Sequence, residues 1–429
     1  NLPPYHRTGV PLTPEVPLHL RFTTAGESHG KGYVAVVEGL PAGLPVSAEW
    51  VDRDLARRMM GYGRGARMKI DRDRIEWLAG VRAGETLGSP VAMLIHNRDW
   101  ANWEDVMGHE AAEPGELRRR RVARPRPGHA DLAGVLKYDR LDARDILERA
   151  SARETAARVA AGALARRLLD EFGVEIGSHV LSLGGVRAGV PAELPTPLNE
   201  AADRSEVRVL DPSVEAEIVR RIDQAKQAGD TLGGEVEVVA RGVVVGLGSH
   251  VSWDRKLDGR LAGLLMSIPA VKGVEIGLGF EGARRPGSAV HDPIDPGSSA
   301  PPTGGDPRGG FRRRSNNAGG LEGGITTGEP VVCRVAMKPI STLMSPLPTV
   351  DLVSGGPANA QSERSDVTAV PALGVIAEAM VAIALADAML EKFGGDSLGE
   401  MRRNYHDYVA ALGSRWTAAR ATGTTGGAG

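Results

Sequence analysis

The chain has little of several features that would fix its class at once. Cys333 is the only cysteine among 429 residues, which excludes an internal disulfide framework and a cysteine-based zinc site. Aromatic residues make up only 4%, so we expect a core of small aliphatic side chains with closely packed helices. The net charge of −2 provides no general attraction for nucleic acid.

Membrane and export signals are also lacking. No apolar run is predicted to reach the length that spans a bilayer, and the first twenty residues lack the charged-then-apolar pattern of a secretory signal. We therefore expect a cytoplasmic protein that binds neither membrane nor nucleic acid. Its 41% hydrophobic and 25% charged content is that of an ordinary globular protein.

Hydrophobic periodicity predicts a mixture of strands and helices. Ser47 is expected to cap a helix over residues 48–60. Gly/Thr turns at Gly84, Gly229 and Gly323 each lead into a β-branched strand. This echo fits a duplicated unit with two similar sheets, although turn chemistry alone also generates it. The other predicted strands and helices cover residues 33–38, 91–95, 234–245 and 330–337, and residues 151–172, 214–227, 257–266 and 372–393, respectively.

Composition predicts one large domain with less ordered extensions. Residues 18–410 show no break and are expected to form a single catalytic domain. Residues 1–17 are Pro-rich and predict an extended N-terminal arm. Residues 286–310 are rich in Pro, Gly, Asp and Ser and predict a mobile loop, and residues 411–429 predict a flexible C-terminal tail.

The stretch over residues 124–165 holds the strongest chemical signal. A loop stiffened by two prolines presents arginines and a histidine, and a long Ala-rich helix follows with polar residues at its start. Arginine offers bidentate donors to phosphate and carboxylate, helix N-termini add positive potential, and histidine moves a proton near neutral pH. The pattern predicts a site for a polyanionic ligand; a surface loop with solvated arginines is the alternative. The residues concerned are Arg124, Arg126, His129, Arg149, Ser151, Arg153 and Glu154.

Two glycine-rich segments near the N-terminus carry further candidates. In the run GESHG, flanking glycines place Ser28 and His29 at a strand edge, where a histidine suits a general acid; a structural histidine is equally compatible. The loop from Gly61 carries arginines and satisfies G-x-G-x-x-G/A on paper. A helix precedes it where a dinucleotide fingerprint needs a strand, so we reject that interpretation. A loop for carboxylates or phosphate remains, with an exposed basic turn as the alternative.

Three later segments add anion-binding chemistry. Close glycines over residues 315–324, including Gly323, allow backbone N–H groups to converge on an anion or a flat cofactor. Residues 338–342 end a predicted strand with a lysine and two hydroxyls, which suits a phosphate. Asp366, two residues after Arg364, is either an ordinary helix-start carboxylate or a base positioned beside that arginine.

Taken together, these segments resemble chorismate synthase. The blocks GESHG, RPGHAD with RASARETA, and RSDVTAVPALGVIAEAM match that family's three hallmark blocks. SIPAVKGVEIG, SNNAGGLEGGI, KPIST and EKFGGDS also fit, in family order. The likeness runs from about residue 21 to residue 404, nearly the whole chain.

The resemblance implies an α+β fold, a β-α-β sandwich with helices packed between two mostly antiparallel four-stranded sheets, assembled as a homotetramer. It implies the last common step of the shikimate pathway, an anti 1,4-elimination of phosphate from 5-enolpyruvylshikimate 3-phosphate to give chorismate. Reduced FMN is required although the reaction has no net redox change. Some family members reduce their own flavin, so NADPH is a candidate reductant, with Arg58 and Arg64 as its candidate contacts.

The resemblance also assigns roles to single residues, and no metal is expected. His29 would protonate the departing phosphate, His129 would balance the charge of the reduced flavin, and Asp366 would keep flavin N5 able to accept the C6 proton. Ser28 and Ser151 would support these groups by hydrogen bonds. The substrate would contact Arg58, Arg64, Arg67, Arg126, Arg153 and Arg364. FMN would contact Arg149, Ala150, Ser151, Pro269, Ala270, Gly323, Lys338, Pro339, Ile340, Ser341, Thr342 and Arg364.

Two functions of other classes compete with this interpretation. A module that binds RNA or polyphosphate through its Arg-Gly loops would retain RNA in a salt-dependent manner and would not bind flavin. A conventional NADPH-dependent flavin reductase would need a dinucleotide site, and no properly placed fingerprint is found.

Overall fold

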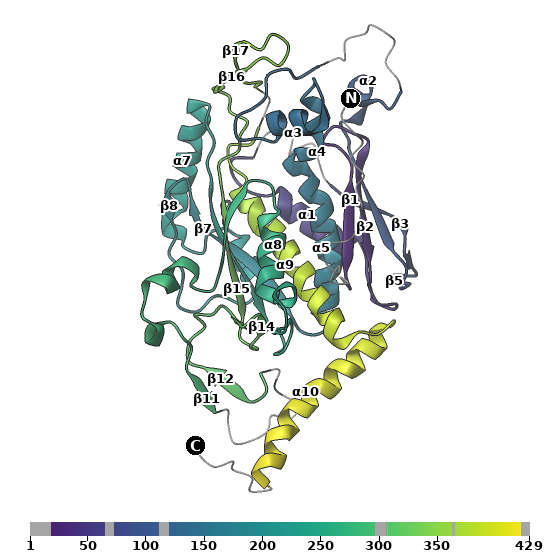
Figure 1. Cartoon of the computed structure of the whole chain (residues 1–429), viewed down its shortest axis with the longest axis vertical. Helices are drawn as coiled ribbons and strands as arrows, with labels where there is room; N and C mark the ends of the chain where they lie inside the picture. The colour runs from purple at the N-terminus through teal and green to yellow at the C-terminus, as the bar shows by residue number, and fades with distance from the viewer. Residues whose placement is uncertain are drawn as a thin grey trace, which may run out of the picture.

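Two antiparallel β-sheets and the helices between them form the frame of the chain (Figure 1). The computed structural model describes residues 19–64, 73–110, 120–296, 306, 308–362 and 365–421. The first sheet has the order β1 (Arg21–Ala25), β2 (Gly32–Glu38), β6 (Val91–His96) and β3 (Ile75–Ala79). The second has the order β10 (Val271–Ile276), β15 (Val331–Met337), β9 (Gly234–Arg241), β7 (Glu175–Leu183) and β8 (Val186–Arg187).

Strand alternation directs one face of the first sheet toward the helices. On β2, Tyr33, Ala35 and Val37 are buried, while Val34 and Val36 between them are half-buried. Tyr33 pairs with Ile95 of β6, which is also buried, so the register keeps both inner faces aligned. A period of two is what a sheet covered mainly on one side requires.

Three helices pack between the sheets: α1 (Ala48–Met59), α5 (Thr155–Asp170) and α9 (Val370–Phe393). Helix α5 contacts β2 on one side and β7 on the other, and α9 contacts β7 and β9. Helix α8 (Leu257–Met266) packs against α9 and β10. The two central helices therefore connect the sheets through one hydrophobic core.

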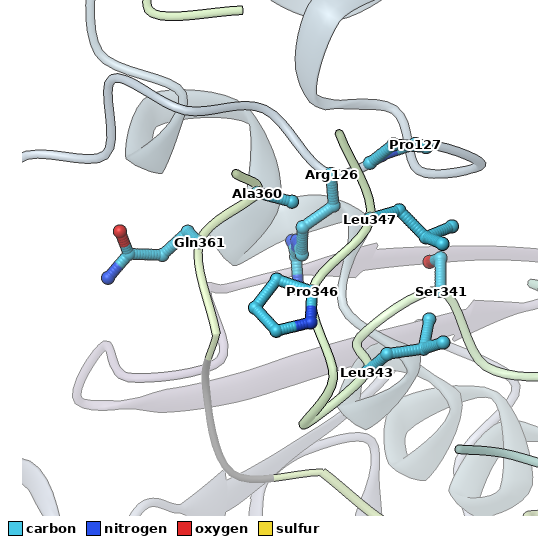
Figure 2. Close-up of a pocket in the computed structure, with 8 residues that line it drawn as sticks. All are labelled: Arg126, Pro127, Ser341, Leu343, Pro346, Leu347, Ala360 and Gln361. Carbon is cyan, nitrogen blue, oxygen red and sulfur yellow. The ribbon is translucent and has the colours of Figure 1, made fainter. Parts of the chain in front are cut away.

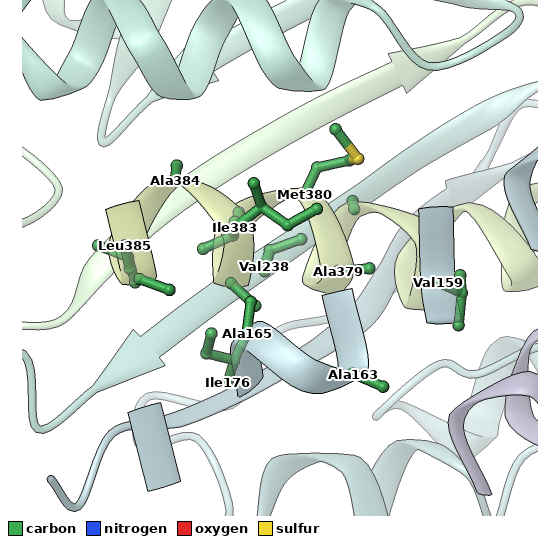
Figure 3. Close-up of a cluster of buried hydrophobic side chains, with 14 of the residues drawn as sticks. Val159, Ala163, Ala165, Ile176, Val238, Ala379, Met380, Ile383, Ala384 and Leu385 are labelled. Carbon is green, nitrogen blue, oxygen red and sulfur yellow. The ribbon is translucent and has the colours of Figure 1, made fainter. Parts of the chain in front are cut away.

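Small side chains allow α5 and α9 to cross closely (Figure 3). A Cβ added to Gly162 of α5 would lie 2.4 Å from the Cβ of Ala379 on α9, so only glycine fits at that point. Around the crossing, Figure 3 shows Ala163 and Ala165 on α5 alongside the stretch of α9 that carries Ala379 and Ile383. The prediction of an aliphatic core with closely packed helices is confirmed.

Helix α9 corrects the expectation that no apolar run reaches membrane-spanning length. Within the described part of the chain it is the one helix long and apolar enough to cross a membrane, with a mean hydropathy of 2.0. That stretch is wholly buried inside the protein. Two of its three carboxylates, Glu378 and Asp387, are buried and have ion-pair partners inside the protein.

The remaining elements surround this frame. Helices α2, α3 and α4 lie at the upper end in Figure 1, α7 lies beside the second sheet, and α10 extends from the end of α9. Four two-stranded sheets are also found among the described residues. Their bounds are α2 (Glu104–Met107), α3 (Asp131–Tyr138), α4 (Arg144–Ala150), α6 (Leu198–Ala202), α7 (Glu215–Ala228), α10 (Leu398–Ala421), β4 (Val81–Arg82) with β5 (Glu85–Thr86), β11 (Ile294–Pro296) with β12 (Phe311–Arg313), β13 (Leu321–Glu322) with β14 (Ile325–Thr326), and β16 (Pro348–Val350) with β17 (Pro357–Asn359).

Most predicted elements are confirmed. Ser47 caps α1 by accepting a hydrogen bond from the N–H of Trp50, and the helix predicted over residues 257–266 has the bounds of α8. The predicted mixture of helices and antiparallel strands is also confirmed. The strand predicted over residues 234–245 is wrong at its end, because Gly242 turns away with φ +75° where its backbone meets that of Gly173.

Four expectations about extent need correction. The second sheet has five strands instead of four, because the two-residue β8 is too short to show a pattern. The helix predicted from residue 151 begins as a 3-10 turn over Ala152–Glu154, and α5 starts at Thr155. The predicted loop over residues 286–310 contains β11, which pairs with β12. The boundary predicted at residue 410 falls inside α10; the arm over residues 1–17 lies outside the described residues.

Candidate active site

A buried carboxylate holds His29 in the turn between β1 and β2. Its Nδ1 lies 2.9 Å from Oε2 of Glu148, and its backbone N–H donates to the same oxygen at 2.9 Å. The backbone N–H of Ser28 donates to the carbonyl of Glu148 at 2.9 Å. Because an ionised carboxylate only accepts, Nδ1 carries a proton and Nε2 is the ring nitrogen that can serve a ligand.

Glu148 lies on α4 and is itself anchored by Arg144, whose Nη1 donates to Oε1 at 2.8 Å. Burial alone would raise the pKa of Glu148, but the hydrogen bond and charge of His29, together with the charge of Arg144, lower it below the usual value. Glu148 is thus an ionised partner that fixes the orientation of His29.

His129 has a similar partner at the start of α3. Its Nδ1 hydrogen-bonds to Oδ1 of Asp131, and Nε of Arg126 donates to Oδ2 of the same carboxylate at 2.8 Å. Burial alone would raise the pKa of Asp131, but the hydrogen bonds and charges of His129 and Arg126 lower it. With its proton directed at Asp131, Nδ1 cannot also accept from Arg126 Nη2 at 3.1 Å, so that approach is a close contact and not a hydrogen bond.

The segment after β15 meets this loop. Nη1 of Arg126 donates to Oγ1 of Thr342 at 2.7 Å, and Nζ of Lys338 donates to the carbonyl of Gly128 at 2.8 Å. Figure 2 shows Arg126 and Pro127 facing Ser341 and Leu343 across a pocket, which is too narrow to hold a water molecule. Residues 338–342, which include Pro339 and Ile340, therefore lie beside the His129 loop.

Arg58 and Arg153 face one buried carboxylate. Nη1 of Arg58 lies 3.6 Å from Oδ2 of Asp73, and Nη2 of Arg153 lies 3.2 Å from its Oδ1. Nε of Arg58 also donates to Oγ1 of Thr155 at 3.0 Å, in the first turn of α5. Burial, reinforced by the charges of Arg64 and Arg153, lowers the pKa of Arg58 to about 10, although Asp73 opposes this effect.

Arg64 and Asp366 form the adjoining pair. Nε of Arg64 lies 3.3 Å from Oδ2 of Asp366, and the N–H of Val367 donates to the carbonyl of Gly63 at 2.9 Å. The two loops are therefore bound to each other by backbone and side chain. Arg67 and Arg364, the other arginines predicted here, lie outside the described residues.

The connection between α4 and α5 carries three further predicted residues. Ser151 follows Ala150, the last residue of α4, and its Oγ donates to Oγ of Ser28 at 3.2 Å. It also caps the 3-10 turn that holds Arg153. Nη2 of Arg149 donates to the carbonyl of Thr24 at 2.8 Å, so its guanidinium is bound to β1.

Pro269 and Ala270 lie near these groups, but Gly323 does not. The N–H of Lys338 donates to the carbonyl of Ala270 at 3.0 Å, and Ala270 adopts φ +68°, which is unusual for a residue with a Cβ. Gly323 forms the turn of the β13–β14 hairpin, and β14 lies far below α3 and α4 in Figure 1. Gly323 is therefore not brought together with the other predicted cofactor residues within one chain.

Two hydrogen bonds connect further segments of the candidate site through Thr231 and Leu232. Thr231 donates through Oγ1 to the carbonyl of Ile340, and the N–H of Leu232 donates to the carbonyl of Val367. These bonds join the segment beside His129 to the segment of Asp366. The hydrogen bonds and ion pairs between described residues do not join His29 directly to His129 or Asp366.

Sequence reasoning missed the partners that orient the predicted residues. Glu148, Asp131 and Asp73 hold His29, His129 and the two arginines, and Trp103 stacks on His29 with ring centroids 3.7 Å apart. Asp131 lies two residues after His129 in the run HAD, which is a usable signal for a carboxylate–histidine pair. Asp73 lies 80 residues before Arg153, and Trp103 lies 74 residues after His29, so no local pattern pairs either residue with these partners.

Comparisons with known proteins agree with the resemblance in the sequence. The family model described as chorismate synthase matches residues 20–390. The chain is 57% identical over 390 residues to the chorismate synthase of Geobacter sulfurreducens, covering 91% of this chain and 98% of the relative. It is 57% identical over 395 residues to that of Desulforudis audaxviator, covering 92% and 98%. A crystal structure of chorismate synthase, 45% identical, superposes with a TM-score of 0.72 over 92% of this chain and 98% of that chain.

Proposed function

The chain belongs to the chorismate synthase family, and we propose that His29, His129, Asp366 and the guanidinium groups at the start of α5 form the site of that family's reaction. The reaction is the elimination of phosphate from 5-enolpyruvylshikimate 3-phosphate to give chorismate, the last common step of the shikimate pathway. It makes the protein a carbon–oxygen lyase. The observation that carries the site assignment is the concentration of buried cations where Arg58, Arg64 and Arg153 meet.

Substrate binding is assigned to these cations. The substrate carries two carboxylates and one phosphate, and buried guanidinium groups interact strongly with such anions because little water competes. Arg58 and Arg153 share Asp73, and Arg64 pairs with Asp366, so the three guanidinium groups are held beside one another by two carboxylates. Arg126, Arg67 and Arg364 complete the proposed substrate contacts.

His29 is assigned as the acid that protonates the departing phosphate. Glu148 is held ionised and accepts a hydrogen bond from Nδ1, which leaves Nε2 as the ring nitrogen from which a proton can pass to the phosphate. Ser28 accepts a hydrogen bond from Ser151 and so holds the turn that carries His29 against the segment before α5. Asp366 is assigned to the side from which the C6 proton departs, beside Arg64.

A reduced flavin, which we propose to be FMN, fits the residues present. Lys338, Ser341 and Thr342 supply a cation and hydroxyls for a phosphate, and His129, polarised by Asp131, suits the edge of a flavin ring. Arg149, Ala150, Ser151, Pro269 and Ala270 complete the proposed contacts, although Pro269 has no N–H and offers only carbonyl or apolar contact. When bound, the reduced flavin supplies electron density that helps the phosphate to leave. NADPH, contacting Arg58 and Arg64, is the proposed reductant where reduction is intrinsic.

We further propose a cytoplasmic homotetramer of single-domain subunits, with a β-α-β sandwich arrangement. The contacts of α5 with both sheets, and of α9 with α5 and the second sheet, support the arrangement. The position of Gly323 supports assembly, because a flavin beside Lys338 reaches a Gly323 only if another subunit provides it.

An anaerobic phosphate-release assay tests the function. We expect phosphate and chorismate in equal amounts with reduced FMN, and neither product with oxidised FMN alone. Product with NADPH and FMN as the only additions would demonstrate intrinsic flavin reduction. Flavin reduction by NADPH without phosphate release, or salt-dependent RNA retention without flavin binding, would replace the proposal by one of the two competing functions.

A further inference from the structure

The side chain of Trp103 lies against the imidazole of His29. The indole and imidazole rings are stacked, with centroids 3.7 Å apart and planes inclined by 27°. Trp103 is itself fixed at two points. The indole Nε1 donates to Oδ2 of Asp99 at 3.0 Å, and the backbone N–H of Trp103 donates to the carbonyl of Trp100 at 2.8 Å. A side chain held at both ends is a rigid surface for its neighbour.

Two arginines also contact the indole, and one of them, Arg144, links it back to the partner of His29. The guanidinium carbons of Arg120 and Arg144 lie 4.4 Å and 5.3 Å from the centroid of the Trp103 ring. Arg144 also donates to Glu148 at 2.8 Å, and Glu148 lies 2.9 Å from Nδ1 of His29. His29, Glu148, Arg144 and Trp103 thus form a closed circuit of contacts.

We propose that Trp103 is a positioning residue for His29, an inference that rests on the proposed function. The bond from Nδ1 to Glu148 fixes one atom of the imidazole but permits the ring to rock about that bond. The flat indole removes this freedom and holds Nε2 at one location, which proton transfer to a departing phosphate requires. The face of the indole also attracts an imidazolium, so the stack persists while His29 carries its proton.

The position of the contact favours a role in reactivity over simple packing. The His29 side chain is only 14% exposed, whereas Trp103 is partly exposed and does not belong to the hydrophobic core. Trp103 therefore contributes little to folding by burial, and its main ordered neighbours are the histidine and two cations. Among the described residues, Glu148 and Arg144 from α4 face His29, and Arg120 from the segment before α3 faces its stacked partner Trp103.

A double-mutant cycle with full-length protein and reduced FMN tests the inference. Trp103→Leu should lower kcat about tenfold or more with KM nearly unchanged, and Trp103→Phe, which keeps a stacking face, should retain most of the activity. In a His29→Ala background, Trp103→Leu should cause no further loss. Trp100→Leu is the matched control, since Trp100 lies three residues away and does not stack on His29. An equal loss in both backgrounds, or unchanged kcat in Trp103→Leu, would overturn the inference.

Indole fluorescence provides a readout that does not depend on turnover. A protonated imidazole in contact with an indole quenches its emission, so the full-length protein should show a pH-dependent change in intensity. His29→Ala and Trp103→Phe should each remove that change, and Trp100→Leu should retain it. If the change persists in either of the first two variants, the stack is absent and the inference fails. If the stack is confirmed but His29→Ala leaves turnover unaltered, the failure lies in the proposed function of His29.

Discussion

Arg57 and Arg58 are consecutive residues of α1, and their guanidinium groups enter two different clusters of buried charge. Arg57 contacts Glu378 at 2.8 Å and Asp203 at 2.7 Å, deep between the sheets. Arg58 has Asp73 at 3.6 Å as its ion-pair partner among the described residues. Both side chains are nearly inaccessible, with exposures of 11% and 6%, so burial does not distinguish them.

The first cluster, which we call the core cluster, balances its charges. Glu378 is fully buried, and each arginine around it also has a second carboxylate. Ser178 and Asn199 donate further hydrogen bonds to Glu378. Three cations thus meet three carboxylates: Arg57, Arg166 and Arg208 with Glu378, Asp54 and Asp203.

The second cluster, which we call the site cluster, consists of Arg58, Arg64, Arg153, Asp73 and Asp366. The pKa values of the neighbouring arginines reflect the difference. Burial would lower the pKa of Arg57, but Glu378 and Asp203 raise it above its usual value. For Arg58, burial together with the charges of Arg64 and Arg153 prevails and lowers the pKa to about 10. Burial also lowers the pKa of Arg208, so the comparison depends on the ion pairs more than on pKa values.

The comparison separates structural cations from ligand-binding cations. A guanidinium whose donors all find carboxylates has nothing left to offer a ligand, and its removal leaves buried charge uncompensated. A guanidinium that is buried among other cations raises the energy of the ligand-free protein, and an anionic substrate relieves that cost. Four changes test this distinction.

The largest effect is expected for Glu378→Gln. The substitution keeps the shape of the side chain but leaves three arginines facing two carboxylates, and breaking a buried ion pair typically costs about 3–5 kcal/mol. Urea unfolding followed by circular dichroism should show a loss of that size in the free energy of unfolding. A loss below about 1 kcal/mol would mean that water or rearranged side chains already compensate the cluster.

Arg58→Gln should lower activity without lowering stability, in contrast to Glu378→Gln. The folded protein binds the Arg58 proton less tightly than the unfolded chain does, so below about pH 10 the charge opposes folding. Its removal should leave the free energy of unfolding equal or higher, while kcat/KM falls on the order of a hundredfold as a buried cation for the substrate is lost. Arg57→Gln, one residue away, is the matched control and should lose stability first. Equal losses of stability in both variants would remove the distinction.

The sequence carries local signals for the candidate site residues but none for the difference between the two clusters. Arg58, Arg64 and Arg153 stand out because glycine turns and a helix start present them, which are local features. Nothing local separates Arg57 from Arg58, because the partner Glu378 follows 321 residues later in the run AEAM of an apolar helix. Only the crossing of α1, α5 and α9 brings these charges together.

The difference between local and tertiary contacts also explains which parts of the fold could be predicted. The cap at Ser47 and the bounds of α8 follow from patterns over about ten residues, and both are confirmed. The two-residue β8 and the early end of β9 depend on neighbouring strands and on the close approach of Gly242 to Gly173, which a local pattern does not record. The orienting partners of the site, such as Glu148 and Trp103, are likewise tertiary.

Acid should weaken the core cluster. The charges of Arg57 and Arg166 lower the pKa of Glu378, against the opposing effect of its burial. A carboxyl whose pKa is lower in the folded state contributes stability above its unfolded pKa of about 4.3 and loses that contribution as the pH falls. Between pH 6 and pH 3 the wild type should therefore lose up to about 2 kcal/mol more than Glu378→Gln does. Urea midpoints measured at intervals over this range check the prediction, and parallel curves for the two proteins would contradict it.

The smallest expected effect concerns two hydroxyls, one in the core cluster and one near the site cluster. Ser178 donates to Glu378 in the core cluster, whereas Oη of Tyr33, buried near Arg153 and Arg58, has no hydrogen-bond partner among the described residues. A buried unpaired hydroxyl costs roughly 1–3 kcal/mol, so Tyr33→Phe should raise the free energy of unfolding by about 1 kcal/mol, and Ser178→Ala should lower it by a similar amount. Thermal and urea unfolding of both variants give the signs directly. A loss of stability in Tyr33→Phe would show that the Tyr33 hydroxyl has a hydrogen-bond partner. The polar groups near the site cluster would then be as fully hydrogen-bonded as those of the core cluster.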